Sequence, residues 1–212
     1  MTTLAWPTLT RAAPQDIDWR LLSNTQKFES PLNRSVQTVE LPGARWAASF
    51  SFEALEIDDA RALYAVLVRL RGMANRVMLP VFHAYAPRGT WAGTPRVNNS
   101  SVSPTTLQTG NTLICDGFTA GATVKAGDYF NVGTDGELKM VVVDGTADGS
   151  GNLTLTFEPP LRQSPPDNET LVSSNPVCQM MLSEDTARWI SHAGNPGALA
   201  NFPLDFIEVF ML

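Results

Sequence analysis

The sequence predicts a mainly β protein: a discontinuous β-sandwich or split-barrel domain with one α-helix, plus a small inserted β-barrel domain. Three observations favour this fold class. The 15 Gly and 15 Pro fall between short apolar runs, as in a fold with many strands and turns. One stretch, residues 46–53, alternates strictly in polarity. Only one segment, from residue 58 to residue 72, has convincing helical periodicity.

The alternating stretch predicts a strand with one buried face. Its apolar set is Trp46, Ala48, Phe50 and Phe52, and its small or polar set is Ala47, Ser49, Ser51 and Glu53. Pro42 and Gly43 precede it and have the backbone preferences of a tight turn. We therefore expect a strand up to Leu41, a turn, and a second strand. An earlier strand is expected over residues 19–28, ending near Pro31.

The helix is predicted from an apolar stripe and from signals at both of its ends. Asp58 or Asp59 can cap its first turn, and Gly72 is expected to end it. The stripe consists of Ala60, Leu63, Leu67 and Leu70, with Val66 beside it, whereas Arg61, Arg69 and Arg71 fall on the opposite side. The helix is therefore expected to pack on a sheet as part of the core.

Two segments rich in Pro and Gly, 86–95 and 164–168, indicate domain boundaries. About five short strands lie between them, enough for a small barrel, and they are expected over residues 112–115, 128–132, 138–144 and 153–157, with a hairpin loop at 145–151. Strands are expected again over 177–182, 188–192 and 204–212. The sequence thus predicts an outer domain made of residues 1–94 and 165–212, and an inserted domain of residues 95–164.

Both ends of the chain are candidate contact segments. Residues 1–18 contain Pro7 and Pro14 and are expected to form an extended arm, which either docks on a neighbour or frays. Residues 204–212 are apolar on both faces. A strand of this kind is either central in its sheet, the simpler interpretation, or covered by another subunit.

No motif in the sequence indicates catalysis, a cofactor or a metal, so we expect no catalytic, cofactor-binding or metal-binding residue. His83 and His192 are isolated, and Asp135, Asp144 and Asp148 are expected to be turn residues. The loop GTADGSG lacks the lysine and the helix of a phosphate-binding loop. Paired carboxylates cannot be recognised from spacing alone, because their pairing is spatial.

Cys115 and Cys178 have no CxxC partner. One disulfide between them is an alternative, but two half-buried free thiols are the simpler interpretation.

Charge and hydropathy exclude several classes of function. The chain has 15 basic and 21 acidic residues, a net charge of −6, and no basic patch interleaved with aromatics, so specific nucleic-acid binding is not expected. No apolar run approaches the ~20 residues that span a bilayer, and the first residues do not resemble a secretory signal. We therefore expect neither membrane insertion nor export.

Four phrases of the sequence carry a resemblance to a known family. These are WRLLSNTQKFESPLNRSVQTVELPGARWAASFSFEAL before the helix, then AGDYFNVG, and then LKMVVVD with GNLTLTFEPPLR. Together they resemble the distal tail proteins of long-tailed bacteriophages. The resemblance implies a structural virion protein, not an enzyme, located at the tail tip and assembled in the host cytoplasm. It further implies a homo-oligomeric ring, a hexamer, that joins the tail tube to the tail-tip hub or baseplate and through which DNA passes.

In that family the second β-domain usually follows the ring-forming domain, whereas here it would interrupt it. Two alternatives stay open. One is another tail subunit: a tube, terminator or baseplate protein. The other is a carbohydrate-binding module over residues 95–164 for attachment to the host, with Trp91 and Tyr129 as candidates to stack on a sugar, although such aromatics are more often core residues.

Overall fold

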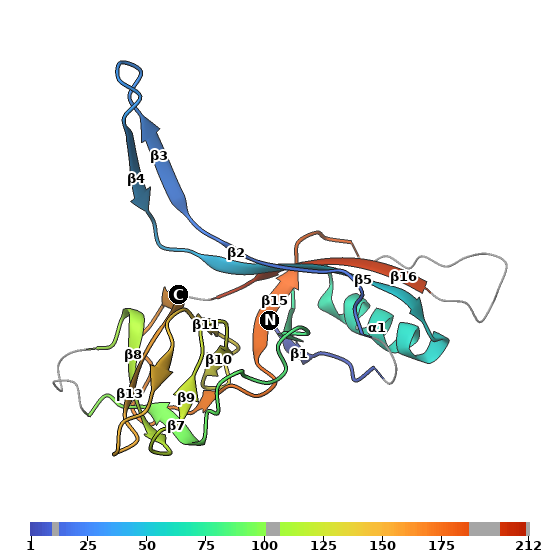
Figure 1. Cartoon of the computed structure of the whole chain (residues 1–212). Helices are drawn as coiled ribbons and strands as arrows, with labels where there is room; N and C mark the ends of the chain where they lie inside the picture. The colour runs from blue at the N-terminus through green and yellow to red at the C-terminus, as the bar shows by residue number, and fades with distance from the viewer. Residues whose placement is uncertain (10–12, 101–106, 187–199, 211–212) are drawn as a thin grey trace.

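A computed structural model describes residues 1–9, 13–100, 107–186 and 200–210, and Figure 1 shows their arrangement. The described residues form a mainly β protein with one helix, which confirms the predicted fold class. The helix, α1, is Ile57–Leu70. The strands are β1 Thr3–Ala5, β2 Ile17–Leu22, β3 Thr25–Glu29, β4 Val36–Glu40, β5 Arg45–Leu55, β6 Arg76–Pro80, β7 Gly93–Val97, β8 Gly110–Phe118, β9 Thr123–Val124, β10 Tyr129–Val132, β11 Leu138–Val141, β12 Gly145–Thr146, β13 Leu153–Leu161, β14 Leu171–Val172, β15 Val177–Leu182 and β16 Ala200–Glu208.

The first large sheet joins both ends of the chain. Its strand order is β1-β6-β15-β16-β5-β2, and every pairing is antiparallel except that of β1 with β6. The last strand, β16, lies between β15 and β5. The central position that we considered simpler for the C-terminal strand is therefore confirmed for the residues described, and it explains why β16 buries side chains as far as Glu208.

The core of this sheet forms where the alternating residues of β5 meet α1. Trp46, Ala48, Phe50 and Phe52 are all buried, as the period of two predicts. The helix contributes Ala60, Leu63, Leu67 and Leu70 to the same cluster, while its arginines are exposed. The cap differs from the prediction: Glu56 occupies the N-cap position and makes no capping hydrogen bond through its side chain, while Asp58 and Asp59 lie in the first turn. At the other end the left-handed residue Arg71 donates its N–H to Val68 O, just before Gly72.

The second large sheet has the order β14-β10-β11-β13-β8-β7 and is nearly closed into a barrel. Its two edge strands approach each other through a bridge between Arg96 and Thr170. Two backbone hydrogen bonds support this bridge: Val97 N to Glu169 O at 2.8 Å, and Asn168 N to Val97 O at 2.9 Å. The small pair of strands β9 and β12 lies beside it, and a separate apolar cluster fills the interior. Closure of this kind leaves little unpaired edge.

The N-terminal arm is not free in the structure. Residues Thr3–Ala5 form the edge strand β1, paired in parallel with β6, and residues 17 and 18 begin β2. Trp6 anchors this segment, because its ring centroid lies 5.7 Å from that of Phe82 and 5.9 Å from that of Phe50. The described part of the arm therefore docks on the protein's own core, which corrects the expectation of a frayed arm or one that docks on a neighbour.

The predicted strand over residues 19–28 is wrong in its extent, because it divides at Ser23 and Asn24 into β2 and β3. The tight turn expected at Pro42 and Gly43 is also wrong. The strands on either side of it, β4 and β5, do not pair with each other; β4 pairs with β3, and β5 pairs with β2. The Pro-Gly dipeptide bends the path of a long two-stranded ribbon where a reversal was expected.

Other boundaries shift by a few residues. The strand expected over 138–144 ends at Val141, and the strand expected over 112–115 extends over Gly110–Phe118. The strand expected at 188–192 lies outside the described residues. The division into domains stays a prediction; the second sheet and its core draw on residues 91–172.

Candidate interaction surface

Strands β3 and β4 form a hairpin that is separate from both large sheets. It projects away from the rest of the molecule (Figure 1), and among the strands that the structure describes each of its two strands pairs only with the other. All ten residues of the two strands are exposed. An isolated two-stranded hairpin is at best marginally stable in water. The side chains of this hairpin therefore do not form a hydrophobic core that would stabilise it.

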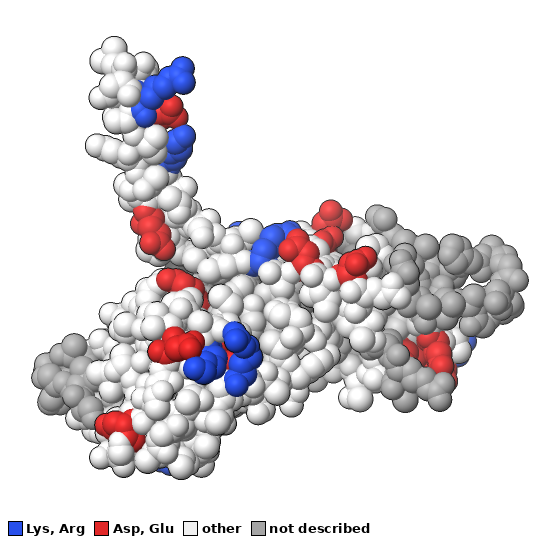
Figure 2. Space-filling model, in the orientation of Figure 1, with Lys and Arg blue, Asp and Glu red and all other residues white. Residues whose placement is uncertain are grey.

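The two faces of the hairpin differ in chemistry. Paired residues share a face, so the register places Gln26 and Val39 on one face with Phe28 and Gln37. This face, which we call the uncharged face, has no ionisable residue. The opposite face consists of Thr25, Lys27, Glu29, Val36, Thr38 and Glu40. Figure 2 shows both signs of charge along the hairpin, and Lys27 and Glu29 form an ion pair at 2.9 Å. The charged face suits solvent, and the uncharged face suits a protein partner.

Two of the exposed apolar side chains of the hairpin strands, Phe28 and Val39, lie on the uncharged face, and the third, Val36, lies on the charged face. Phe28 is 57% exposed and Val39 47%, and at the tip Leu32 is 97% exposed. Phe28 and Val39 are diagonal neighbours, because Phe28 pairs with Gln37 and Val39 with Gln26. Exposed aromatic and aliphatic side chains grouped on one surface are typical of protein–protein contacts.

The root of the hairpin contains a bend. Between the pairs Leu22–Arg45 and Thr25–Glu40, two residues on one strand oppose four residues, 41–44, on the other. Such an excess of residues on one strand bends a ribbon. Asn24 holds the bend: its backbone carbonyl accepts a hydrogen bond from Leu41 N at 2.7 Å, and its side-chain amide donates to Pro42 O at 2.7 Å. The hairpin therefore leaves the sheet in a defined direction.

The two large sheets are joined by polar contacts that are part-buried or buried. The side chain of Asn131, in β10, accepts a hydrogen bond from Val177 N at 2.9 Å and donates one to Val177 O at 2.7 Å. Gln179 N, in β15, donates to Gly136 O at 3.0 Å. The amide of an asparagine side chain has an acceptor and donors, so it can bond to both the N–H and the C=O of one residue in a neighbouring strand. These bonds attach the barrel to the middle of the first sheet.

Neither aromatic residue that we considered for sugar stacking is available for it. Trp91 is 7% exposed, and its indole nitrogen donates to Asp128 Oδ2 at 2.9 Å. Tyr129 is 9% exposed and packs against Trp46 and His83. Both are core residues, the more common role of such aromatics. The carbohydrate-binding hypothesis therefore loses the two residues that it named.

The cysteines and the one histidine that the structure describes also have structural surroundings. Cys115 and Cys178 are free thiols buried in separate clusters, which confirms that they do not form a disulfide, although they are more deeply buried than expected. Burial raises the pKa of both thiols. His83 lies against Trp19 and Tyr129, and partial burial lowers its pKa. His192 lies outside the described residues.

The aspartates of the barrel loops organise turns. Asp148 Oδ1 accepts hydrogen bonds from Ser150 N and Asn152 N, both at 2.8 Å, and so closes the loop before β13. Asp144 accepts from Ala126 N at 2.8 Å and pairs with Lys125. These hydrogen bonds lower the pKa of both carboxyl groups. The expectation of turn residues is confirmed for Asp144 and Asp148, while Asp135 is exposed in the turn before β11.

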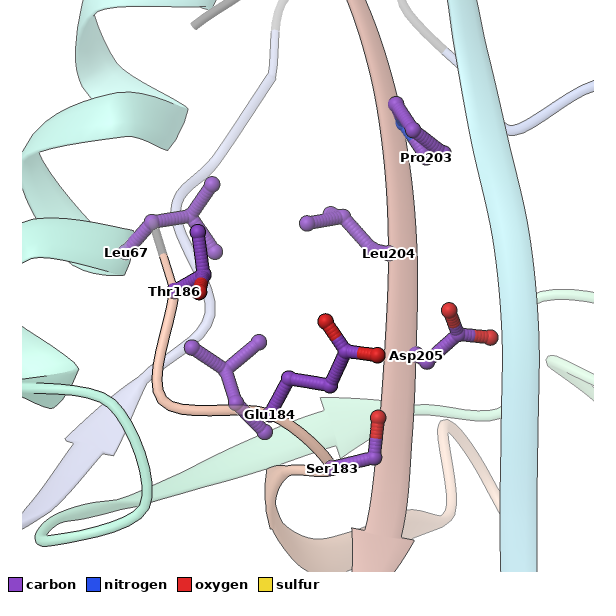
Figure 3. A pocket seen from close by; sticks show the side chains of 8 residues that line it. Leu67, Ser183, Glu184, Thr186, Pro203, Leu204 and Asp205 are labelled. Carbon is purple, nitrogen blue, oxygen red and sulfur yellow. The ribbon is translucent and has the colours of Figure 1, made fainter. Parts of the chain in front are cut away.

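A hollow of about 260 Å³ lies between α1 and β16 (Figure 3). Leu67, Leu182 and Leu204 form its apolar lining, and Leu67 and Leu204 point toward one another across it. Glu184 and Asp205 are exposed at its rim. Among the residues described, no three His, Cys, Asp or Glu side chains are grouped so that they could hold a metal ion. We assign no chemistry to this hollow.

Sequence reasoning missed the hairpin because one long strand was expected across Ser23 and Asn24. The signal was the turn-forming stretch SPLNRS, which lies between two short polar runs that contain β-branched or aromatic residues, 25–29 and 36–40. In the part of the chain that the structure covers, the one helix is too short and too polar to cross a bilayer.

Two comparisons with known proteins complete this description. No protein-family model matches the sequence, and no curated protein is similar enough to it to count as a relative.

Proposed function

We propose that this protein is a structural subunit of a ring at the tail tip of a long-tailed bacteriophage, a distal tail protein that joins the tail tube to the tip hub or baseplate. The observation that carries this proposal is the projecting β3–β4 hairpin with its uncharged face. The resemblance in the sequence supplies the setting, and the hairpin supplies a means of assembly.

A ring requires each subunit to present two different surfaces, one to each neighbour. A hairpin that extends away from the body of its own chain can reach a second copy, and its uncharged face can lie on that copy without burying a charge, since it carries no ionisable group. A hairpin carried by a bent, hydrogen-bonded root arrives at a fixed angle, which a closed ring needs. In this proposal six copies close the ring.

The test compares two substitutions of the same residue type on opposite faces of one strand. Val39 on the uncharged face is 47% exposed, and Val36 on the charged face is 51% exposed. Val39→Ser and Val36→Ser therefore remove the same side chain at nearly the same exposure, so that their effects on the folded monomer are matched. We expect Val39→Ser, and more strongly Phe28→Ser, to weaken assembly, whereas Val36→Ser leaves it unchanged.

Assembly is measured by light scattering after size exclusion and by negative-stain images of the particles. Six-fold rings in the wild type, lost in Val39→Ser and retained in Val36→Ser, support the proposal. A wild type that stays monomeric at high concentration and forms no ring in the virion refutes it. Images of the tail also separate the related roles, because a tube protein repeats along the tail and a terminator lies at the end next to the head.

A further inference from the structure

Arg162 lies where the barrel, the last strand and the root of the hairpin meet. It directly follows β13, and its guanidinium forms a two-pronged ion pair with Glu208 of β16: Nη1 lies 2.9 Å from Oε1, and Nη2 lies 2.8 Å from Oε2. The side chain of Glu208 is 1% exposed and that of Arg162 is 14% exposed. Paired planar groups of this kind fix direction as well as distance.

The same two side chains also hold the backbone at the root of the hairpin. Arg162 Nη2 donates a hydrogen bond to Ala44 O at 3.2 Å, and Glu208 Oε2 accepts one from Trp46 N at 2.9 Å. Ala44 is the last residue of the bend and Trp46 is the second residue of β5. The ion pair therefore forms hydrogen bonds with the backbone on both sides of Arg45, where the ribbon leaves the sheet.

Further contacts keep the guanidinium in place. It lies 3.8 Å from the ring centroid of Phe210, and Glu137 Oε1 lies 3.6 Å from Nη1. Glu137 in turn pairs with the buried Lys139 at 2.6 Å, and Lys139 donates to Pro160 O at 2.7 Å. Well-packed apolar side chains often stabilise a protein as much as a buried ion pair does, so stability alone explains this network poorly.

We propose that Arg162 is a positioning residue that fixes the direction of the β3–β4 hairpin relative to the barrel. The bend at residues 41–44 is held at two points: Asn24 holds it on the hairpin side, and Arg162 with Glu208 holds it on the sheet side. Without the second hold, the residues between these points act as a hinge. The consequence for assembly rests on the proposed function: a ring contact through the hairpin sets the orientation of every barrel.

The test measures the direction of the hairpin in the folded protein. Cysteines introduced as Leu32→Cys at the hairpin tip and Ser150→Cys on an exposed barrel turn carry spin labels, while the native Cys115 and Cys178, both 0% exposed, do not react. The distance distribution between the labels is recorded by pulsed electron paramagnetic resonance, with labelled protein diluted into unlabelled protein so that distances between subunits do not contribute.

Two variants remove the part of the hold that Arg162 supplies. Arg162→Lys keeps the positive charge but loses the bidentate geometry of the guanidinium. Arg162→Met combined with Glu208→Gln removes both charges together and keeps a hydrogen-bond acceptor for Trp46 N. The control is Arg96→Lys, in a barrel ion pair of 3.9 Å with Asp116 that does not touch the hairpin root. We expect one narrow distribution for the wild type and for the control, and a distribution at least about twice as wide for both Arg162 variants.

A purely structural role for Arg162 predicts a different result: a lower unfolding temperature with an unchanged, narrow distribution. That result overturns the proposal, and so does a wild-type distribution as wide as that of the variants. The distance measurement does not depend on ring formation. A wild type that forms no ring, with widened distributions in the Arg162 variants, therefore refutes the proposed function and leaves the positioning role of Arg162 supported.

Discussion

The indole nitrogen of Trp46 donates a hydrogen bond to the carbonyl oxygen of Leu138 at 3.0 Å, and both residues are buried. Trp46 lies in β5 of the first sheet and Leu138 in β11 of the second, 92 residues further along the chain. The alternating pattern of residues 46–53 predicted only that Trp46 is buried. In the structure Trp46 also joins the two sheets. Its ring packs against Tyr129, which comes from the barrel as well.

Trp46→Phe tests this link, because it keeps an aromatic ring and removes the donor. Removing one partner of a buried hydrogen bond costs roughly 1–3 kcal/mol, and we expect a loss of that size in the free energy of unfolding. Trp19→Phe is the matched control, since Trp19 Nε1 is buried and has no hydrogen-bond partner among the residues that the structure describes. Urea denaturation of both variants checks the prediction, and equal losses would contradict it.

The sequence predicted the elements that bury a clear face and failed where tertiary pairing decides. The alternation from Trp46 to Phe52 and the stripe from Ala60 to Leu70 are properties of single segments, and both are present as predicted. The division of β2 from β3 at Asn24 depends on which strand pairs with which, and that choice is set by partners far along the chain.

The polar contacts that join the two sheets could not be predicted from the sequence either. Arg162 and Glu208 lie 46 residues apart, and neither belongs to a recognisable motif. Asp128 is an ordinary loop aspartate in the sequence, yet in the structure it is 2% exposed and gathers donors from two segments. Polar partners that meet only through folding leave no periodic signal, whereas apolar faces do.

Phe50→Asp should abolish folding and, with it, assembly. Phe50 is 4% exposed and stacks on Phe206 with centroids 5.7 Å apart. An unpaired carboxylate at this position costs several kcal/mol, a large part of the roughly 5–15 kcal/mol that holds a domain folded. Circular dichroism and recovery of soluble protein measure the effect.

The control for Phe50→Asp is Ser51→Asp on the next residue of the same strand, whose side chain lies on the opposite face and is only half-buried. It should fold and assemble as the wild type does. A soluble Phe50→Asp protein that still forms rings would show that the core lies elsewhere.

Asp128→Asn should destabilise the loop at residues 88–91, which precedes the barrel strand β7. The carboxylate accepts hydrogen bonds from Arg88 N at 2.6 Å, from Gly89 N at 3.1 Å and from Lys125 N at 2.9 Å, as well as from the indole of Trp91. Asparagine offers one acceptor oxygen in place of two and brings a donor against these N–H groups. We expect a loss of roughly 3 kcal/mol in the free energy of unfolding, since hydrogen bonds to charged groups are worth about 1.5–3 kcal/mol each.

Hydrogen exchange at Gly89 and Lys125 measures the effect of Asp128→Asn locally, and denaturant unfolding measures it globally. Asp144→Asn, an exposed loop carboxylate with a backbone and a lysine partner, is the control and should change stability much less. Unchanged protection at Gly89 would argue against this role for Asp128.

The buried thiols should make the protein less stable in base. Burial raises the pKa of Cys178 well above its ordinary value of 9.0, so the folded thiol stays protonated while the unfolded thiol ionises. Above that value the unfolded state binds fewer protons, and stability falls as the pH rises. The contribution of the thiol is complete below pH 9.0 and is lost as the pH rises toward the folded pKa.

Cys178→Ala isolates this effect, because it removes the titrating group and leaves Cys115 and Lys139 unchanged. Lys139 has the opposite sign: burial lowers its pKa, so its deprotonation favours the folded state as the pH rises, equally in both proteins. The advantage of the wild type over Cys178→Ala should shrink by about 1.4 kcal/mol between about pH 8 and about pH 10. Urea unfolding at these two values measures it, and a constant difference would mean that the folded thiol ionises as freely as the unfolded one.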